Sequence, residues 1–228
     1  MNIGIEQVMQ SWGWDNISDE QVYDEEIKIA LMADELGYDD VWVVEHHFED
    51  YSFCPDNFVY LAHLAALTKR IKLATGATIL PWNIQPLRVA EKAAMLDYLS
   101  NGRFILGFGR GLSRREYEQF GIPMEESRGR FDEAADMILK ALETGVMEEH
   151  HGQYFDQPRA VIRPKPKASF RDRLKQVAMS DDSVEEAAIL GAQMMQFTYK
   201  PLEVHKAEIG AYCAAYKRHH GTDAPVPI

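Results

Sequence analysis

Four short segments of this sequence combine ionisable, hydroxyl or glycine residues in patterns that could support catalysis or ligand binding. Each segment lies at the end of an apolar run that predicts a β-strand. The four are Glu45-His46-His47, Gly76-Ala77-Thr78, Gly109-Arg110-Gly111 and Ser180-Asp181-Asp182-Ser183. In a parallel barrel the C-terminal ends of the strands meet on one face, where active sites are built. Four such segments in succession therefore indicate a functional site on this face rather than four unrelated loops. We call the segments at the C-terminal ends of the strands the rim.

The first segment offers acid–base chemistry. A carboxylate beside an imidazole, here Glu45 beside His46, could fix the ring tautomer and make His46 a proton donor or acceptor. A satisfied polar pair at a strand end is the non-catalytic interpretation, and the residues alone leave both interpretations open.

The histidine pairs do not predict a metal site. Adjacent residues in extended chain point to opposite sides, so His46 and His47 cannot easily share one metal ion. The pairs His150-His151 and His219-His220 lie in irregular or terminal chain and are expected to be solvated. A metal hydrolase is therefore the weakest of the enzyme hypotheses.

Two arginines and two serines predict an anion site. In a chain with 24 basic and 36 acidic residues, Arg110 and Arg128 near a cleft indicate an anionic ligand such as a phosphate. Ser180 and Ser183 at the start of a helix add hydroxyl and free N–H groups. Ordinary ion pairs and helix capping are the alternatives.

The glycines from position 107 do not form a dinucleotide-binding fingerprint, because Leu112 stands where the third glycine is required.

Several aromatic side chains near predicted strand ends could line an apolar pocket. They are Trp12, Trp14, Phe53, Trp82 and Phe197. Core packing is the commoner role for any one of them taken singly.

The elements that position these residues alternate between strand and helix. Strands are predicted over residues 3–8, 41–44, 71–80, 103–108, 175–179 and 192–197, and helices lie between and after them. Most strands are apolar on both faces, which is typical of a parallel sheet covered by helices. The pattern therefore predicts an α/β protein, either a TIM-barrel-like (β/α) fold or an open doubly wound sheet.

The length predicts a single domain over residues 1–228. These 228 residues, 46% of them hydrophobic, suffice for one sizeable core. Residues 146–167 are rich in glycine and proline and predict an irregular excursion outside the core. An eight-stranded barrel takes about 250 residues, whereas only six strand–helix units are found. Strands seven and eight are expected to be missing, so the chain is either a fragment or a shortened barrel.

The composition argues against several partners. A formal charge of −12 makes nucleic acid and anionic membranes improbable. Charged residues interrupt every apolar run, and residues 1–6 do not resemble a signal peptide. Cys54 and Cys213 lie far apart, so a disulfide framework is not expected and the predicted location is the cytoplasm.

Several motifs in order along the chain resemble the bacterial luciferase-like flavin monooxygenase family. The resemblance covers essentially the whole chain. It is carried by Val41-Trp42-Val43-Val44-Glu45-His46-His47-Phe48, Leu80-Pro81, Pro86-Leu87-Arg88-Val89-Ala90-Glu91, Leu99-Ser100-Asn101-Gly102-Arg103-Phe104, Gly109-Arg110-Gly111, Ser127-Arg128, Arg163-Pro164-Lys165-Pro166 and Val177-Ala178-Met179-Ser180.

This resemblance implies a TIM-barrel-like fold that binds reduced FMN supplied by a separate flavin reductase. The flavin would react with O₂ to give a C4a-peroxide that oxygenates a small organic substrate. His46, with Glu45 beside it, matches the family's active-site histidine. The matching cofactor positions are Gly76 and Ala77, joined by a cis peptide bond in the family, the phosphate-binding Arg110, Arg128, Ser180 and Ser183, and Leu112 and Met179 as backbone or apolar contacts. Luciferase subunits carry a carboxylate at position 179, so light emission is not expected.

Other functions on this scaffold stay open. A deazaflavin-dependent oxidoreductase and a non-catalytic flavin-binding protein are the two alternatives. The family commonly pairs subunits through helices beside strands two and three, so a homodimer is expected.

Overall fold

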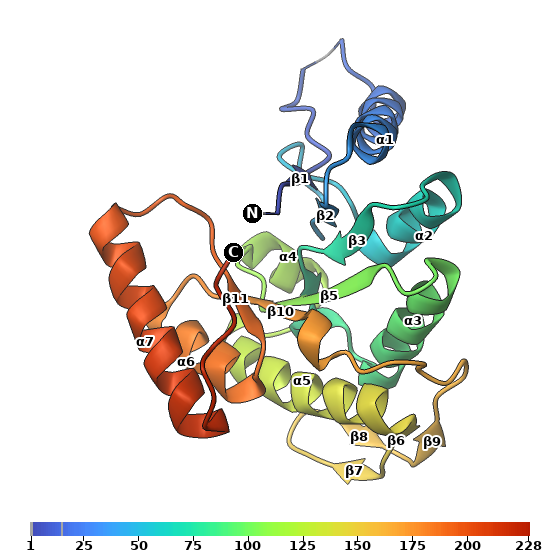
Figure 1. The fold of residues 1–228 in the computed structure, drawn as a ribbon. Coiled ribbons are helices and arrows are strands. Elements are labelled where there is room, and N and C mark those ends of the chain that lie inside the picture. Colours follow the sequence, from blue (N-terminus) through green and yellow to red (C-terminus); the bar gives the residue numbers. More distant parts are fainter. Residues whose placement is uncertain (1, 15) are drawn as a thin grey trace.

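The computed structural model describes residues 2–14 and 16–228 and contains one curled, all-parallel sheet (Figure 1). Its strand order is β1-β2-β3-β5-β10-β11, and β4 also pairs with β5. The strands are β1 Gly4–Gln7, β2 Asp40–Val43, β3 Lys72–Thr75, β4 Thr78–Ile79, β5 Phe104–Gly109, β10 Leu174–Val177 and β11 Gln193–Met195. The prediction of a TIM-barrel-like α/β fold is therefore confirmed.

Consecutive strand–helix units place neighbouring strands in register. Val41 pairs with Ile5 on one side and with Leu73 on the other, and Leu174 pairs with Leu106. At the edge formed by β11, Ile228 donates to the Met194 carbonyl and accepts from the Gln196 amide.

The strand predicted over residues 71–80 is interrupted. β3 ends at Thr75 and β4 begins at Thr78, with a cis peptide bond between Gly76 and Ala77. Side chains hold both sides of this break: the Thr75 hydroxyl bonds to both backbone groups of Gly107, and Asn57 Nδ2 donates to the Ala77 carbonyl. A Cβ at Gly107 would lie 2.0 Å from the Thr75 carbonyl oxygen, so only glycine fits there.

Most of the longer helices lie on the outside of the sheet (Figure 1). Ser18 and Gln21 form the expected capping box at the first helix, and Gly37, Gly145 and Gly191 end helices in the left-handed conformation. The helices are α1 Asp19–Leu36, α2 Asn57–Leu67, α3 Pro86–Leu99, α4 Arg114–Gln119, α5 Ser127–Thr144, α6 Asp181–Leu190 and α7 Leu202–His220, with short 3₁₀ turns η1 Leu80–Trp82, η2 Met124–Glu126 and η3 Arg171–Arg173.

Residues 146–161 form two small antiparallel pairs outside the main sheet. β6 Val146–Met147 pairs with β9 Ala160–Val161, and β7 His150–His151 pairs with β8 Asp156–Gln157. Glu133 of α5 anchors them, because its carboxylate lies 2.8 Å from His150 Nε2 and accepts the Phe155 amide at 3.0 Å. The expectation that both histidines are solvated is wrong for His150, which is half-buried against Glu133.

The described residues form three apolar clusters, the smallest of which is Ile79, Trp82 and Tyr117. The main cluster lies between the sheet and helices α1, α2, α3 and α5, and a smaller one joins β11 to α6 and α7 around Tyr212 and Met194. Arg103, just before β5, links the main cluster's elements: its guanidinium donates to Ile71 O at 2.8 Å, Ala65 O at 3.0 Å and Thr68 O at 3.2 Å.

Replacing Arg103 tests this link. We expect Arg103→Met to lower the free energy of unfolding by about 2–4 kcal/mol, because the three carbonyls lose a charged donor. Urea denaturation followed by circular dichroism measures the loss. The control is Arg88→Met, since Arg88 is exposed with a single ion pair to Glu91 and should change stability by less than about 0.5 kcal/mol. Equal stability of the two variants would contradict the prediction.

Candidate functional site

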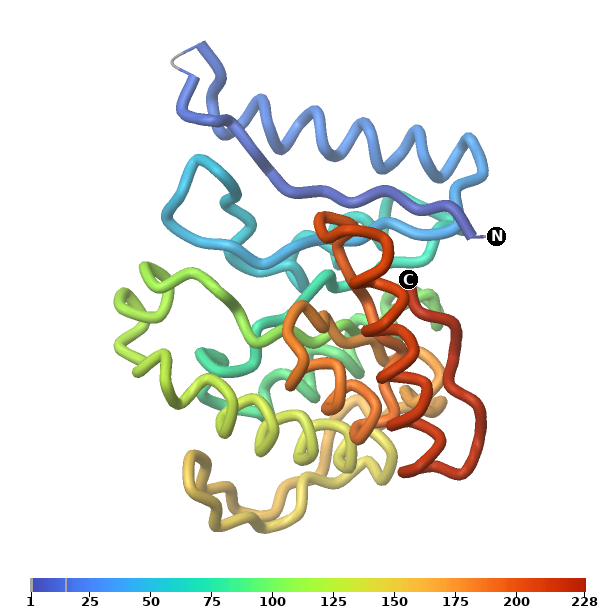
Figure 2. The backbone as a smooth tube through the Cα atoms, turned by 90° about the vertical axis from the view of Figure 1, so that its left-hand side faces the viewer, coloured from blue at the N-terminus to red at the C-terminus, as the bar shows by residue number. Residues whose placement is uncertain are grey.

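The predicted rim residues follow neighbouring strands of the sheet. His46 follows β2, the Gly76–Ala77 bond follows β3, Arg110 follows β5, and Ser180 lies after β10. Figure 2 shows that the loops after β2 and β5 project on the same side of the molecule. Sheet order therefore places Gly76–Ala77 between the His46 loop and the Arg110 loop.

His46 is held by a carboxylate that the sequence reasoning missed. Its Nδ1 lies 3.1 Å from Glu116 Oε1 in α4, and the same oxygen accepts the His47 amide at 2.7 Å. Glu116 is 1% exposed, whereas the His46 side chain is 22% exposed. A carboxylate partner favours a proton on Nδ1, which leaves Nε2 of the neutral ring as the free acceptor.

Glu45 does not form the expected pair with His46. Its carboxylate accepts Trp82 Nε1 at 2.6 Å and the Ile79 amide at 3.1 Å. It also lies 3.6 Å from His47 Nε2. The reason is the alternation of side chains along extended chain, which separates Glu45 from His46 just as it separates His46 from His47. Glu45 instead orients Trp82 and η1.

Glu116 is only partly satisfied. Its Oε2 is buried and has no hydrogen-bond partner in the part of the chain that the structure describes. Buried polar atoms are almost always paired, so a half-satisfied carboxylate beside a partly exposed imidazole marks a functional site candidate.

Two aromatic side chains, Trp82 and Tyr117, pack against the loop that carries Arg110. Trp82 packs edge-on against Tyr117 with ring centroids 5.1 Å apart, and the Tyr117 hydroxyl donates to the Arg110 carbonyl. Burial raises the pKa of Tyr117 to about 12, so the hydroxyl stays protonated as a donor. Gly111 has φ of +77°, and a Cβ there would lie 2.7 Å from the Trp82 ring. Adjacent residues of α4, Glu116 and Tyr117, thus fix the His46 and Arg110 loops together.

The aromatic residues proposed for an apolar pocket divide into two groups. Trp82 is buried and Phe53 packs against the main core, whereas Trp12, Trp14 and Phe197 are exposed. Tyr51, which the sequence reasoning did not single out, packs edge-on against His46 at 5.6 Å and against Trp12 at 6.0 Å. His46, Tyr51 and Trp12 therefore form a continuous row of rings.

The structure brings the four predicted phosphate-binding residues together. Arg110 Nη2 lies 3.4 Å from Ser180 Oγ, and Ser183 and Ser180 form a capping box at the start of α6. Arg110 Nη1 lies 3.4 Å from Asp182, and Arg128 of α5 contacts the same carboxylate. The two guanidinium groups and the first turn of α6 therefore converge on one anionic group.

The remaining predicted positions flank this cluster. Leu112 is 74% exposed beside Arg110. The Met179 carbonyl accepts Lys200 Nζ at 3.0 Å, and its sulfur lies 3.5 Å from the Phe197 amide nitrogen. Gly76 and Ala77 are buried, with Ala77 against Gly109, where an added Cβ would lie 3.1 Å away.

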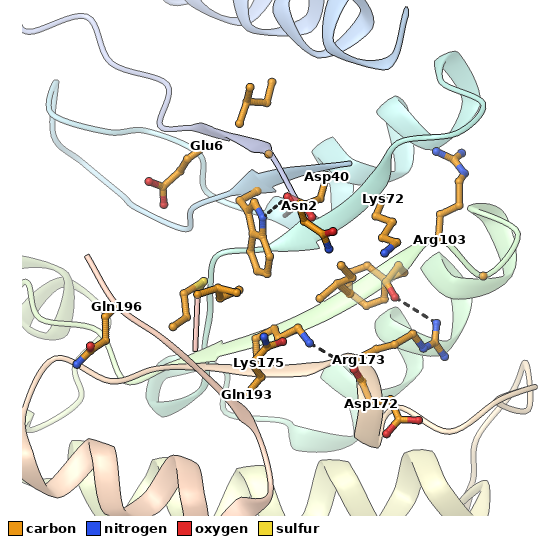
Figure 3. A pocket seen from close by; sticks show the side chains of 18 of the residues that line it. Asn2, Glu6, Asp40, Lys72, Arg103, Asp172, Arg173, Lys175, Gln193 and Gln196 are labelled. Carbon is orange, nitrogen blue, oxygen red and sulfur yellow. Dashed lines mark hydrogen bonds between the residues drawn. The ribbon is translucent and has the colours of Figure 1, made fainter. Parts of the chain in front are cut away.

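A cleft of about 660 Å³ lies along the inner side of the curled sheet, lined by residues of β1, β2, β3, β5, β10 and β11 (Figure 3). Charged side chains line it, among them Glu6, Lys72 and Lys175, and burial lowers the pKa of Lys175. His46, Arg110 and Arg128 do not line this cleft, but Glu6, which does, lies near enough to His46 that the imidazole opposes the rise of the Glu6 pKa caused by burial.

Within residues 2–14 and 16–228, no three histidine, cysteine or acidic side chains converge as metal ligands. None of the helices in this part of the chain is long and apolar enough to cross a membrane. The two histidines near the C-terminus bind other groups of α6. His219 Nε2 lies 3.4 Å from Glu185, and His220 Nε2 lies 2.7 Å from the Ala188 carbonyl oxygen.

Comparisons with known sequences point to one family. The family model for luciferase-like monooxygenases matches residues 1–228. The oxygenase component of the flavin-dependent trigonelline monooxygenase of Acinetobacter baylyi is 32% identical over 86% of this chain and 53% of its own length. The alkanal monooxygenase alpha chain of Photorhabdus luminescens is 29% identical over 82% of this chain and 51% of its own length. The chain thus spans about half the length of these curated relatives.

Solved structures agree on the fold. Monooxygenase RslO1 from Streptomyces bottropensis has a TM-score of 0.81 and 32% identity, over 99% of this chain and 68% of that one. The oxygenating constituent of 3,6-diketocamphane monooxygenase from Pseudomonas putida, solved with FMN, has a TM-score of 0.82 at 22% identity, over 99% and 64%. The second likeness concerns the fold alone. With a family model matched along its whole length, the chain belongs to the luciferase-like monooxygenase family.

Proposed function

We propose that this chain is the flavin-binding part of an FMN-dependent monooxygenase that uses reduced flavin and O₂ to oxygenate a small organic substrate. The observation that carries the proposal is the convergence of Arg110, Arg128 and Ser180 on one anion position, on the same rim as the His46–Glu116 pair. The Acinetobacter relative is named as flavin-dependent, which supports the same chemistry.

The residues at the anion position fit the phosphate of FMN. Two guanidinium groups, the Ser180 hydroxyl and the start of α6 are suited to a phosphate dianion, while the Ser183 hydroxyl donates to the Ser180 carbonyl at 2.7 Å and so fixes the turn. An anionic group, the Asp182 carboxylate, already lies against both arginines. Arg110, Arg128, Ser180 and Ser183 would hold the phosphate.

The residues between the two ends fit a flat, mostly apolar ring. Gly76 and Ala77 lie between the His46 and Arg110 loops, and Gly109 packs on Ala77 without a side chain. Leu112 and Met179 flank the phosphate end and would provide apolar or backbone contacts.

His46 is the proposed catalytic residue, and Glu116 is its positioning residue. The flavin supplies the reaction with O₂ when it is bound. His46 Nε2 can hold or transfer one proton at the rim, because Glu116 keeps the other ring nitrogen protonated and stabilises the charged ring. Glu45 acts indirectly, since it holds Trp82 and η1 behind the rim.

A deazaflavin-dependent oxidoreductase is the second candidate. An F420-dependent secondary alcohol dehydrogenase shares the fold with a TM-score of 0.82 at 20% identity. Side-by-side titration with reduced FMN and reduced F420 separates the two: FMN should bind more tightly if the first proposal holds.

The proposal includes a reductase and a second copy of the chain as partners. The Acinetobacter relative is named as an oxygenase component, which supports a separate flavin reductase. Exposed apolar side chains on adjacent helices support the homodimer expected through α2 and α3: Val59 and Leu67 on α2, and Met95, Tyr98 and Leu99 on α3. The free thiols of Cys54 and Cys213 are consistent with the proposed cytoplasmic location.

Replacing His46 tests the proton-transfer role. We expect His46→Ala to bind FMN with a Kd within about threefold of wild type but to lose at least about 100-fold in oxygenated product per turnover. Flavin titration and product analysis measure the two quantities. His63→Ala, an exposed change on α2, is the control. Unchanged product yield in His46→Ala would refute the role.

Replacing Glu116 tests the positioning role. Glu116→Gln keeps the size of the side chain but cannot stabilise a charged His46, so kcat should fall about tenfold or more while the Kd for FMN is unchanged. Glu118→Gln, an exposed change on the same helix, should match wild type. If both variants keep the wild-type kcat, Glu116 has only a structural role.

Replacing Arg128 tests the phosphate site. Arg128→Met should weaken FMN binding about tenfold or more and leave riboflavin binding unchanged, because riboflavin lacks the phosphate. Lys140→Met on the exposed side of α5 is the control. Equal losses for FMN and riboflavin would show that Arg128 acts on folding rather than on phosphate.

A further inference from the structure

The arginines proposed to hold the phosphate are already paired with acidic residues of this chain. Asp182 contacts Arg128, and its Oδ2 lies 3.4 Å from Arg110 Nη1. Glu186, one turn further along α6, also contacts Arg128, and Asp132 lies 3.9 Å from it. Every ligand phosphate must therefore compete with side chains of the protein.

Asp182 occupies the same donors that a phosphate would use. Arg110 Nη2 reaches Ser180 Oγ at 3.4 Å, so Asp182 lies in the space bounded by Arg110, Arg128 and Ser180. It stands in the first turn of α6, where the free N–H groups also favour an anion. A hydrogen bond with Ser180, followed by contacts with Arg128 and Arg110, holds the pKa of Asp182 well below its usual range despite partial burial. The group is thus negatively charged throughout the neutral pH range.

The Asp182 and Glu186 carboxylates differ in how easily they can move away from Arg128. The Asp182 side chain is 58% exposed, so it can turn into water when another anion arrives. The Glu186 side chain is only 20% exposed and stays against Arg128. Asp182 is therefore the removable partner, and Glu186 is the fixed one.

We propose that Asp182 is an internal competitor for the phosphate group, which lowers the affinity of this site for a phosphate monoester and speeds its release. The inference rests on the proposed function, because it concerns the same phosphate site. If the flavin is exchanged with a separate reductase in every cycle, a lower affinity for its phosphate allows faster release. The competing carboxylate makes the empty site self-neutralised, so that its two arginines do not attract other anions.

Binding of FMN and riboflavin to three proteins tests the inference. The proteins are wild type, Asp182→Asn and Asp181→Asn, and quenching of flavin fluorescence gives each Kd. The adjacent Asp181 is exposed, so its variant carries the same change of net charge without the arginine contacts. Exposed ion pairs contribute little to stability, so both variants should fold like wild type, which thermal melting checks.

We expect Asp182→Asn to bind FMN on the order of 3- to 10-fold more tightly than wild type, with a slower release rate. Riboflavin affinity should be unchanged in all three proteins, and Asp181→Asn should match wild type for both ligands. If Asp182→Asn binds FMN no more tightly than wild type, while wild type prefers FMN to riboflavin, the competitor role is wrong and the phosphate site stands. If none of the three proteins prefers FMN to riboflavin, the phosphate site itself is wrong, and the inference fails with it.

Discussion

The geometry of the rim depends on the buried carboxylate of Glu116. The carboxylate accepts hydrogen bonds from His46 Nδ1 and from the His47 backbone N–H. These bonds attach α4 to the loop that follows β2. A buried acceptor that loses its hydrogen-bond donors is left unsatisfied, at a cost of about 1–3 kcal/mol. The next residue, Tyr117, binds the Arg110 carbonyl. One turn of a six-residue helix thus sets the distance between the proposed proton-transfer group and the proposed phosphate site.

The two ends of the rim use acidic residues in opposite ways. Glu116 is fully buried and has a fixed partner, which suits a residue that orients a catalytic ring. Asp182 is largely exposed and shares its arginines with whatever anion binds, which suits a residue that adjusts affinity. Between them, Gly76, Ala77 and Gly109 leave the backbone free of bulky side chains. The chain therefore supplies position and charge, while the proposed flavin supplies the redox chemistry.

Local sequence patterns predicted the strands, most helices and the polar strand ends, because apolar periodicity and capping residues act over a few positions. The break between β3 and β4 was not predictable from that pattern, since residues 71–80 are apolar on both sides of Gly76. The role of Glu116 was missed because it depends on how α4 docks 70 residues away from His46. The motif Ser113-Arg114-Arg115-Glu116 did carry a signal, because serine followed three residues later by glutamate indicates a helix start. The Glu45–His46 pairing was wrong for a local reason, the alternation of side chains in extended chain.

A structure of this chain with reduced FMN, solved under anaerobic conditions, tests the central claim most directly. The account predicts the phosphate between Arg110 and Arg128 at the start of α6, Asp182 turned away into solvent, and the ring against Gly76–Ala77 within reach of His46. FMN bound in the cleft between β1 and β11, or with its phosphate away from both arginines, would contradict the account.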